Sequence, residues 1–184
     1  MGKILFIRGG AVGDFILTLP AIQLVRSTLP DVEIEILGYE SITELAVRCG
    51  LADRTRSIEH AAMAPFFAPG AKLDEETCTY FASFDVVISY LYDPDDFFAA
   101  NLERAGVETL IRGPYRMDES EPWVCTSRQL AARLEQLALF LVEPFVKVSY
   151  GSAERDSDRP LVAIHPGSGS PAKNWGLENW VDLM

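Results

Sequence analysis

The order of apolar runs and turns in the first 37 residues is the feature that most constrains the fold. Residues 4–7 form an unbroken apolar run, residues 9–13 are rich in glycine, apolar positions recur at helical spacing across 14–28, and apolar residues alternate with glutamate across 32–37. A short apolar run between turns predicts a strand that is buried on both faces. The sequence therefore opens as strand, turn, helix and strand, the repeating unit of an α/β protein with a parallel sheet.

The same alternation continues along the chain. Further strands are predicted at 55–58, 84–90 and 108–111, and further helices at 41–49, 74–82, 93–104 and 126–142, with a loop rich in Ala, Pro and Phe before residue 74. Five strands separated by helices predict an α/β fold with a doubly wound parallel sheet. Pro20 predicts a kink or a short first segment in the helix at 14–28. Glu33 and Glu35 alternate with apolar residues, which predicts that the second strand lies near the sheet edge or is half exposed.

The composition changes after residue 150. Residues 151–160 are polar and have the composition of a linker, and residues 161–164 then begin a fresh buried strand that leads to a helix at Leu177. We therefore predict a first domain at 1–150, a linker at 151–160 and the truncated beginning of a second α/β domain at 161–184. The chain is interpreted as a fragment of a longer protein.

Charge and cysteine content exclude several classes of function. The chain has 27 Asp+Glu against 16 Lys+Arg, a formal net charge of −11, and such an excess of acid argues against a nucleic-acid binder. The hydrophobic fraction of 48% excludes global disorder. Cys49, Cys78 and Cys125 are widely spaced, so neither a disulfide framework nor a zinc site is expected. No apolar stretch approaches the about 20 residues of a membrane span, and we expect a cytoplasmic, soluble chain.

The glycine turn at 9–13 is the first loop that could carry chemistry. It fails the dinucleotide-binding pattern, because Arg8 stands where the first glycine should be, and it lacks the Gly-Lys-Ser/Thr of a phosphate loop. What remains is a turn that lets a ligand approach the backbone and that ends in the carboxylate of Asp14 at a helix start. Asp14 is a candidate site residue, and the competing structural interpretation makes it the N-cap of the helix.

The loop at 165–175 is the second loop that could carry chemistry. Small residues expose successive backbone N–H groups, Ser168 and Ser170 flank Gly169 and add hydroxyl donors, and Lys173 adds a positive charge just before a helix. This combination suits a phosphate or diphosphate. A flexible surface turn with a solvated lysine explains the composition equally well.

These two loops also carry a resemblance to a known family. Two blocks of the sequence resemble the N-terminal signature of the lipopolysaccharide heptosyltransferases and the opening of their second domain, namely residues 3–8, 13–14 and 17–21, and residues 164–168, 173–175 and 177–180. Members of that family are inverting glycosyltransferases of the GT-B type, with two facing Rossmann-like domains. The middle of the chain is only loosely similar.

The resemblance implies roles for individual residues. It makes Asp14 the general base and Lys173 a contact of the donor phosphates, with Ser168, Gly169 and Ser170 beside it. The glycine turn, with Gly9, Gly10 and Gly13, and the residues Tyr92 and Asp93 after the strand at 84–90 then lie on the acceptor side.

The resemblance also implies a substrate class and a location. The donor is a nucleotide-sugar, ADP-heptose by default, and the acceptor is a lipopolysaccharide core or another glycan. The scheme requires no metal and no cofactor, and contact with the cytoplasmic face of the inner membrane stays open. Because the remainder of the donor domain is expected downstream, the 184 residues alone are expected to be inactive.

Two alternatives remain. Asp93-Pro94-Asp95 matches the Asp-x-Asp pattern of metal-dependent glycosyltransferases, although Pro94 and the acidic residues favour a helix start instead. The chain could also be a non-catalytic α/β binding module or a dinucleotide-dependent enzyme that uses the first glycine turn.

Overall fold

The computed structural model describes residues 2–148, 162, 164–167 and 170–183, and the chain divides into two units, Met1–Tyr150 and Gly151–Met184. The predicted linker at 151–160 lies outside the described residues, and the assignment of the units as domains stays a prediction.

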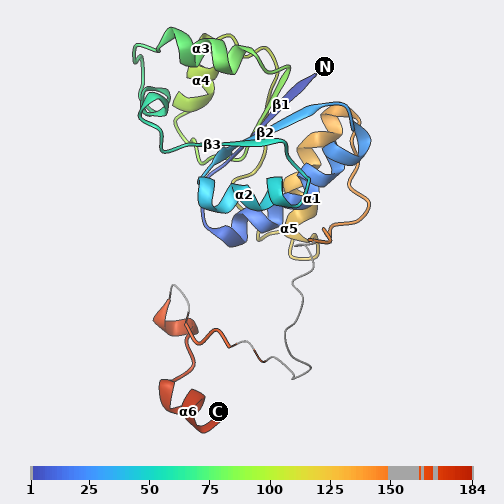
Figure 1. Cartoon of the computed structure of the whole chain (residues 1–184), viewed down its shortest axis with the longest axis vertical. Helices are drawn as coiled ribbons and strands as arrows, with labels where there is room; N and C mark the ends of the chain where they lie inside the picture. The colour runs from blue at the N-terminus through green and yellow to red at the C-terminus, as the bar shows by residue number, and fades with distance from the viewer. Residues whose placement is uncertain (1, 149–161, 163, 168–169, 184) are drawn as a thin grey trace. The chain divides into compact units, whose positions relative to one another are not determined.

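A five-stranded parallel sheet with the order β3-β2-β1-β4-β5 forms the centre of the first unit (Figure 1). Its strands are β1 (Lys3–Arg8), β2 (Glu33–Gly38), β3 (Arg54–Ser57), β4 (Val86–Ser89) and β5 (Leu110–Arg112), and every pairing between neighbours is parallel. The predicted Rossmann-like α/β fold is confirmed. The apolar run in β1 lies in the middle of the sheet, which explains why residues 4–7 are all buried.

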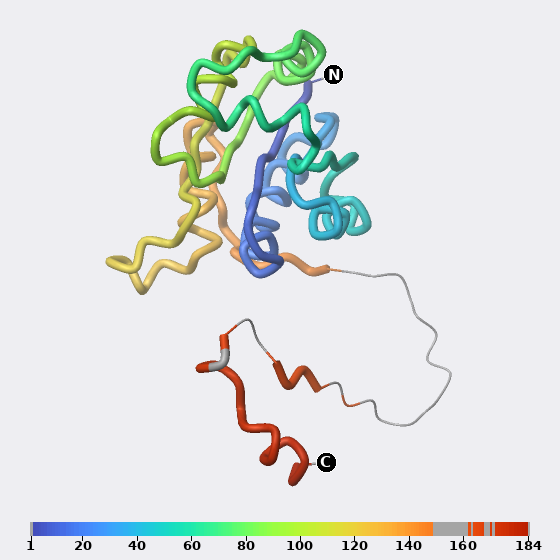
Figure 2. Tube along the Cα trace, turned by 90° about the vertical axis from the view of Figure 1, so that its left-hand side faces the viewer, coloured from blue at the N-terminus to red at the C-terminus, as the bar shows by residue number. Residues whose placement is uncertain are grey.

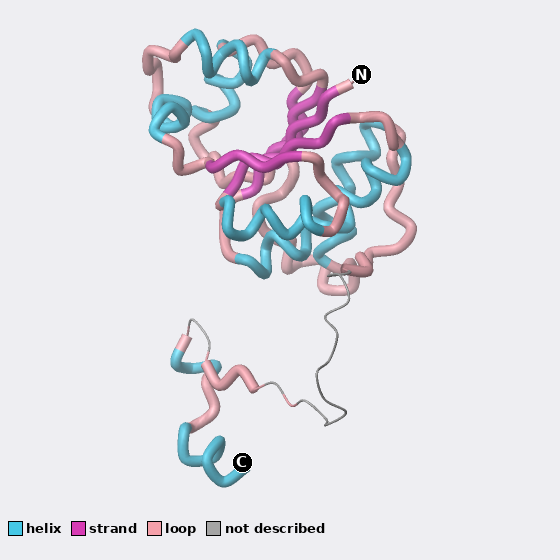
Figure 3. Tube along the Cα trace, in the orientation of Figure 1, coloured by secondary structure: helices cyan, strands magenta, loops and turns pink. Residues whose placement is uncertain are grey.

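Helices cover both faces of this sheet (Figures 1 and 3). One face carries α1 (Val12–Thr28), α2 (Glu40–Arg48), α5 (Thr126–Ala131) and the 3-10 helix η2 (Ala132–Leu137), and the other carries the 3-10 helix η1 (Ala61–Phe67), α3 (Glu75–Ala82) and α4 (Phe97–Arg104). Side chains of β1 alternate between the two cores, with Ile4 and Phe6 in one and Leu5 and Ile7 in the other.

The second strand is more deeply buried than its sequence predicts. Glu35 is only 8% exposed, because the Tyr80 hydroxyl donates to its Oε1 atom at 2.8 Å and Arg56 Nε lies 3.8 Å from the same atom. Burial, together with the Glu35 carboxylate, raises the pKa of Tyr80. The alternative of a half-exposed strand is therefore wrong, since a partner from α3 covers the acidic side chain. The alternative of a position near the sheet edge is confirmed, because β2 lies next to the edge strand β3.

The leucine-rich segment at 126–142 is the second correction. The predicted long helix ends at Ala131, continues as η2, and stops at Ala138, whose φ is 57°. The turn at Ala138 lets Leu139 enter the core, and the Arg128 guanidinium donates to the carbonyl oxygens of Leu141 and Val142 at 3.0 and 2.7 Å. These contacts attach the segment after η2 to α5 and give two backbone carbonyl groups a donor.

Two smaller expectations also change. Helix α1 is continuous through Pro20, so the alternative of a short first segment is wrong. The predicted loop before α3 contains η1, whose Met63 and Phe66 are buried. The buried Asn101 amide donates to the carbonyl oxygens of Phe66 and Ala68 at 3.0 and 2.9 Å and so fixes this segment against α4.

The second unit contains the 3-10 helix η3 (Pro171–Lys173) and α6 (Leu177–Leu183), which confirms a helix from Leu177. Of the strand predicted at 161–164, residues 161 and 163 lie outside the described residues, whereas Val162 and Ile164 are exposed and belong to no strand. A parallel strand forms only against a neighbouring strand, and the described part of this unit holds none. Among the described residues of the whole chain, no helix is long and apolar enough to span a membrane.

Candidate functional site

A cavity of about 510 Å³ lies at the carboxyl ends of the central strands. The chain leaves β1 toward α1 on one face of the sheet and leaves β4 toward α4 on the other, so the two loops diverge and leave a crevice between them. Open parallel sheets bind their ligands at this kind of position. The residues that line the cavity are Arg8, Gly9, Gly10, Asp14, Tyr39, Tyr90, Leu91, Tyr92, Tyr115 and Arg116.

The glycine turn brings the backbone close to Asp14. Gly10 has a φ of 98°, which side-chain-bearing residues rarely adopt, and a Cβ added there would lie 2.9 Å from Asp14 Oδ2. Glycine at position 10 is therefore required by both the turn and the nearby carboxylate.

Asp14 is the third residue of the helix and lies in its first turn rather than at its N-cap. Ala11 occupies the N-cap position, and Asp14 Oδ2 accepts a hydrogen bond from the Ala11 N–H at 3.2 Å, as the acidic residue of a capping box does. The N-cap interpretation is thus wrong in position, although the carboxylate does stabilise the helix start. The Asp14 side chain is still 51% exposed, and it faces the cavity.

Arg8 forms the buried wall of the cavity. Its side chain is 5% exposed, and its Nη1 atom donates to the carbonyl oxygens of Tyr90 and Tyr115 at 3.1 and 3.2 Å. Its Nη2 atom lies 3.9 Å from Asp14 Oδ1, and its buried Nε has no hydrogen-bond partner in the described part of the chain. Burial lowers the pKa of this guanidinium, while Asp14 and Tyr90 act to raise it. Arg8 therefore joins the ends of β1 and β4 to the loop that follows β5.

That loop completes the cavity. It runs past the carboxyl end of the sheet, in yellow in Figure 2, and it brings Tyr115 against Tyr92 with 4.6 Å between ring centroids. The Arg116 guanidinium lies 5.5 Å from the centroid of the Tyr115 ring. The Tyr90 hydroxyl points away and donates to the Leu130 carbonyl oxygen at 3.1 Å, and burial raises the pKa of Tyr90.

Asp93 caps a helix, as the structural interpretation predicts. Its carboxylate oxygens accept hydrogen bonds from the N–H groups of Phe98 and Ala99 at 3.1 and 2.9 Å in the first turn of α4. The described residues contain no group of three His, Cys, Asp or Glu side chains that could hold a metal ion. Asp93 lines an adjacent cavity and not the one at Asp14.

The structure brings together four of the predicted site residues. Gly9, Gly10, Asp14 and Tyr92 line one cavity, whereas Gly13 lies in the first turn of α1 outside that lining. In the second unit, Lys173 is exposed at the end of η3, and its N–H donates to the Ser170 carbonyl oxygen at 3.0 Å. Ser168 and Gly169 lie outside the described residues.

Sequence reasoning missed the contribution of Arg8, Tyr39, Tyr115 and Arg116. Tyr115 and Arg116 come directly after a predicted strand, and all loops that follow the strands of a parallel sheet meet at one edge. That rule, applied to the last strand, would have found them. A charged residue that ends a wholly apolar run was the available signal for Arg8.

Among the solved structures that share the fold are two glycosyltransferases, while no family model and no curated protein matches the chain. Escherichia coli heptosyltransferase WaaC with ADP-2-deoxy-2-fluoro heptose is 14% identical with a TM-score of 0.63, and the match covers 98% of this chain and 64% of that one. The glycosyl transferase family 9 structure from Veillonella parvula DSM 2008 is 15% identical with a TM-score of 0.63, and the match covers 99% of this chain and 58% of that one.

The chain has the fold of these glycosyltransferases. It spans less than two thirds of the length of each. The resemblance seen in the two sequence blocks is thus confirmed as a shared fold.

Proposed function

We propose that this chain is the acceptor-side part of an inverting glycosyltransferase that moves a sugar from a nucleotide-sugar to a glycan. The observation that carries the proposal is the half-exposed carboxylate of Asp14, which faces a cavity at the point where the loops after β1 and β4 diverge. The fold shared with two glycosyltransferases supports it.

In the proposed reaction, the Asp14 carboxylate accepts the proton of an acceptor hydroxyl while that oxygen attacks the anomeric carbon of the donor. The new C–O bond forms on the face opposite the leaving nucleoside diphosphate, whose C–O bond breaks, and the configuration inverts. Lys173 and the N–H groups of residues 168–170 would meet the charge that grows on the leaving group. One neighbour was solved with an ADP-sugar analogue, which favours ADP-heptose as the donor to test first.

The cavity charges favour an anionic acceptor, such as a lipopolysaccharide core, although the whole chain is acidic. Arg8 and Arg116 line the cavity against the single carboxylate of Asp14, so the local formal charge is positive. Local charge steers a ligand more strongly than net charge does. Such an acceptor places the reaction in the cytoplasm, with peripheral contact at the inner membrane.

The first experiment substitutes Asp14 in the complete gene product, which is called the longer chain below. Asp14→Asn should lower kcat for transfer to a glycan acceptor by about 10²–10⁴-fold, because an amide cannot accept the proton. Asp31→Asn, an exposed aspartate in the turn after α1, serves as the matched control and should keep its rate. A near-native rate in Asp14→Asn would leave this residue only a structural role, in its contacts with Ala11 and Arg8.

The second experiment tests the donor loop with Lys173→Ala and its control Lys72→Ala, both exposed lysines. Lys173→Ala should raise KM for the donor and leave KM for the acceptor unchanged. ADP should raise the melting temperature of the longer chain, and NAD(H) should not. Stabilisation by NAD(H) instead would favour the dinucleotide-dependent alternative.

A further inference from the structure

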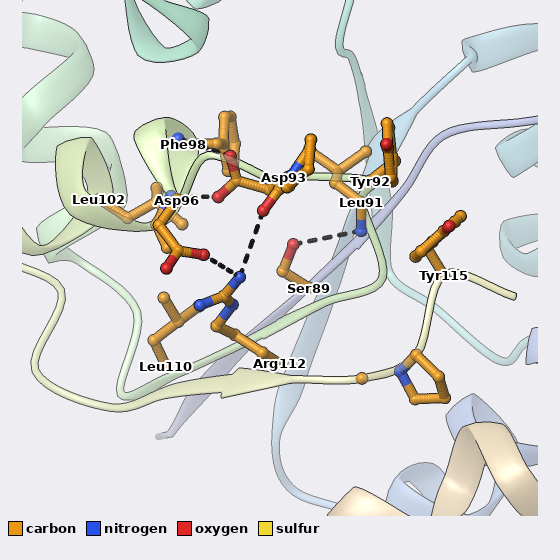
Figure 4. Close-up of a pocket in the computed structure, with 14 residues that line it drawn as sticks. Ser89, Leu91, Tyr92, Asp93, Asp96, Phe98, Leu102, Leu110, Arg112 and Tyr115 are labelled. Carbon is orange, nitrogen blue, oxygen red and sulfur yellow. Dashed lines mark hydrogen bonds and ion pairs between the residues drawn. The ribbon is translucent and has the colours of Figure 1, made fainter. Parts of the chain in front are cut away.

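A second cavity of about 410 Å³ adjoins the one at Asp14. It lies between the ends of β4 and β5 and the start of α4, as Figure 4 shows. Leu91, Phe98, Leu102 and Leu110 line its apolar part, and Asp96 and Arg112 lie at its polar side. An apolar pocket with a few placed polar groups is typical of a small-molecule site.

The two cavities share one wall. Leu91, Tyr92 and Tyr115 line both of them, and the two tyrosine rings lie together at a centroid distance of 4.6 Å. Both rings are partly open, with Tyr92 63% and Tyr115 41% exposed. A ligand that reaches Asp14 therefore lies next to the same rings that border the second cavity.

The polar groups of the second cavity have unused hydrogen-bonding capacity. Arg112 uses Nη2 for both of its contacts, the Oδ1 atom of Asp96 and the carbonyl oxygen of Asp93 at 3.4 Å. Figure 4 shows this guanidinium between the two aspartates. The Arg112 and Asp96 side chains are half or more exposed, so a ligand can reach the remaining guanidinium N–H groups and the second carboxylate oxygen.

The charges of this cavity disfavour an anion. One arginine faces two aspartates, a formal charge of +1 − 2 = −1. The carboxylate of Asp93 is already occupied by the N–H groups of Phe98 and Ala99, which leaves an ion pair that offers both donors and acceptors. Hydroxyl groups, which donate and accept, match such a pair better than a phosphate or a carboxylate does.

We propose that this second cavity is a subsite for an uncharged sugar ring of the acceptor, next to the ring whose hydroxyl reacts at Asp14. The hydroxyls of that ring bond to Asp96 and Arg112, and its C–H face lies against Tyr92 and Tyr115. The proposal rests on the proposed function, and it makes the acceptor an oligosaccharide with at least two rings.

The test measures sugar binding by the 184-residue chain itself, from backbone amide NMR shifts during titration. The probes are neutral methyl hexosides of gluco, manno and galacto configuration, the corresponding disaccharides, and glucuronate as the charged analogue. At least one neutral sugar should shift the amides at 91–93, 112, 113 and 115, and glucuronate should bind there more weakly.

Two variants identify the groups that bind. Arg112→Met should weaken the neutral sugar by about tenfold, because a charged donor is lost. Arg54→Met is the matched control, because Arg54 also forms a surface ion pair, with Glu33, and lies on the opposite edge strand of the sheet. This variant should bind the neutral sugar as the native chain does. Tyr92→Ala removes an exposed ring that the fold does not require, and it should weaken binding even if Arg112→Met fails to fold.

Three outcomes would overturn the proposal: no neutral sugar shifts these amides, glucuronate binds more tightly, or Arg112→Met and Arg54→Met bind alike. Its failure is distinguishable from failure of the proposed function. Sugar binding here without transfer by the longer chain refutes only the transferase, and transfer without binding here refutes only the subsite.

Discussion

Replacing Arg8 by methionine tests whether one buried guanidinium holds three loops together. The side chain donates to the Tyr90 and Tyr115 carbonyl oxygens at 3.1 and 3.2 Å and lies 3.9 Å from Asp14. Methionine keeps the unbranched stem of arginine but ends before the guanidinium, so Arg8→Met removes the charge and the donors and keeps the packing of the stem.

The expected cost comes from the two carbonyl groups. A hydrogen bond from a charged donor contributes about 1.5–3 kcal/mol, but removing the guanidinium also returns the desolvation cost of a buried ion, which is of similar size. The main remaining cost is that the buried Tyr90 carbonyl oxygen loses its donor, which should lower the free energy of unfolding by about 1–3 kcal/mol. For a chain of this size, about 2 kcal/mol lowers Tm by about 4–8 °C. Arg8→Lys, which can reach one carbonyl group, should fall in between.

Urea unfolding followed by circular dichroism gives the free energy, and amide hydrogen exchange reports on the loop. In Arg8→Met the amides around Tyr115 should exchange faster, because their tether to β1 is gone. Arg116→Met is the control, since within the described part of the chain this guanidinium has only the face of the Tyr115 ring as a partner. Its free energy of unfolding should change by no more than about 0.5 kcal/mol. An Arg8→Met protein as stable as the native one, with unchanged exchange at the loop, would refute the tether.

Two further predictions concern stability. Gly113→Ala would push a Cβ into the ring of the buried Tyr90 and should lower the free energy of unfolding by about 1–3 kcal/mol. Gly13→Ala, where a Cβ would lie in open space within α1, is the control and should not lower it. Equal melting temperatures for the two variants would contradict this prediction. Burial acts to raise the pKa of Asp53, but hydrogen bonds from a backbone N–H and from the Arg26 guanidinium outweigh it, and the pKa is lowered. The contribution of the Asp53 carboxylate to stability is therefore complete above about pH 4 and is lost as the pH falls. Asp53→Asn should therefore flatten the pH dependence of urea unfolding below about pH 4, and an unchanged slope would contradict the assignment.

The sheet was predictable because its signals are local. The two central strands, β1 and β4, are short apolar runs, and such runs in alternation with helical segments allow few topologies. The errors have partners far along the chain. Glu35 is acidic in a strand, yet Tyr80 buries it, and no local pattern reveals a hydrogen bond between residues 45 positions apart. The leucine spacing after Thr126 predicts a helix, but the packing of Leu139 ends it early.

The candidate site divides in the same way. Asp14 and the glycine turn were found because they follow a buried strand directly, where parallel sheets place ligands. The contact between Arg8 and Tyr115 joins residues 107 positions apart, and the pairing of β1 with β4 and of β4 with β5 brings them together. A local motif thus identifies the candidate carboxylate, whereas the walls around it depend on the strand order.

Strand order also gives the two cavities opposite charge. Arg8 and Arg116 oppose one carboxylate at Asp14, while Arg112 opposes two aspartates beyond the tyrosine pair. If the proposed function holds, selection of an anionic acceptor by a chain with a net charge of −11 would have to rest on local charge rather than on long-range attraction. We therefore expect an acceptor with an acidic group on one ring and a neutral second ring to bind in one direction, with the acidic ring at Asp14. In this proposal the charges on either side of the tyrosine pair would set the direction in which the acceptor binds.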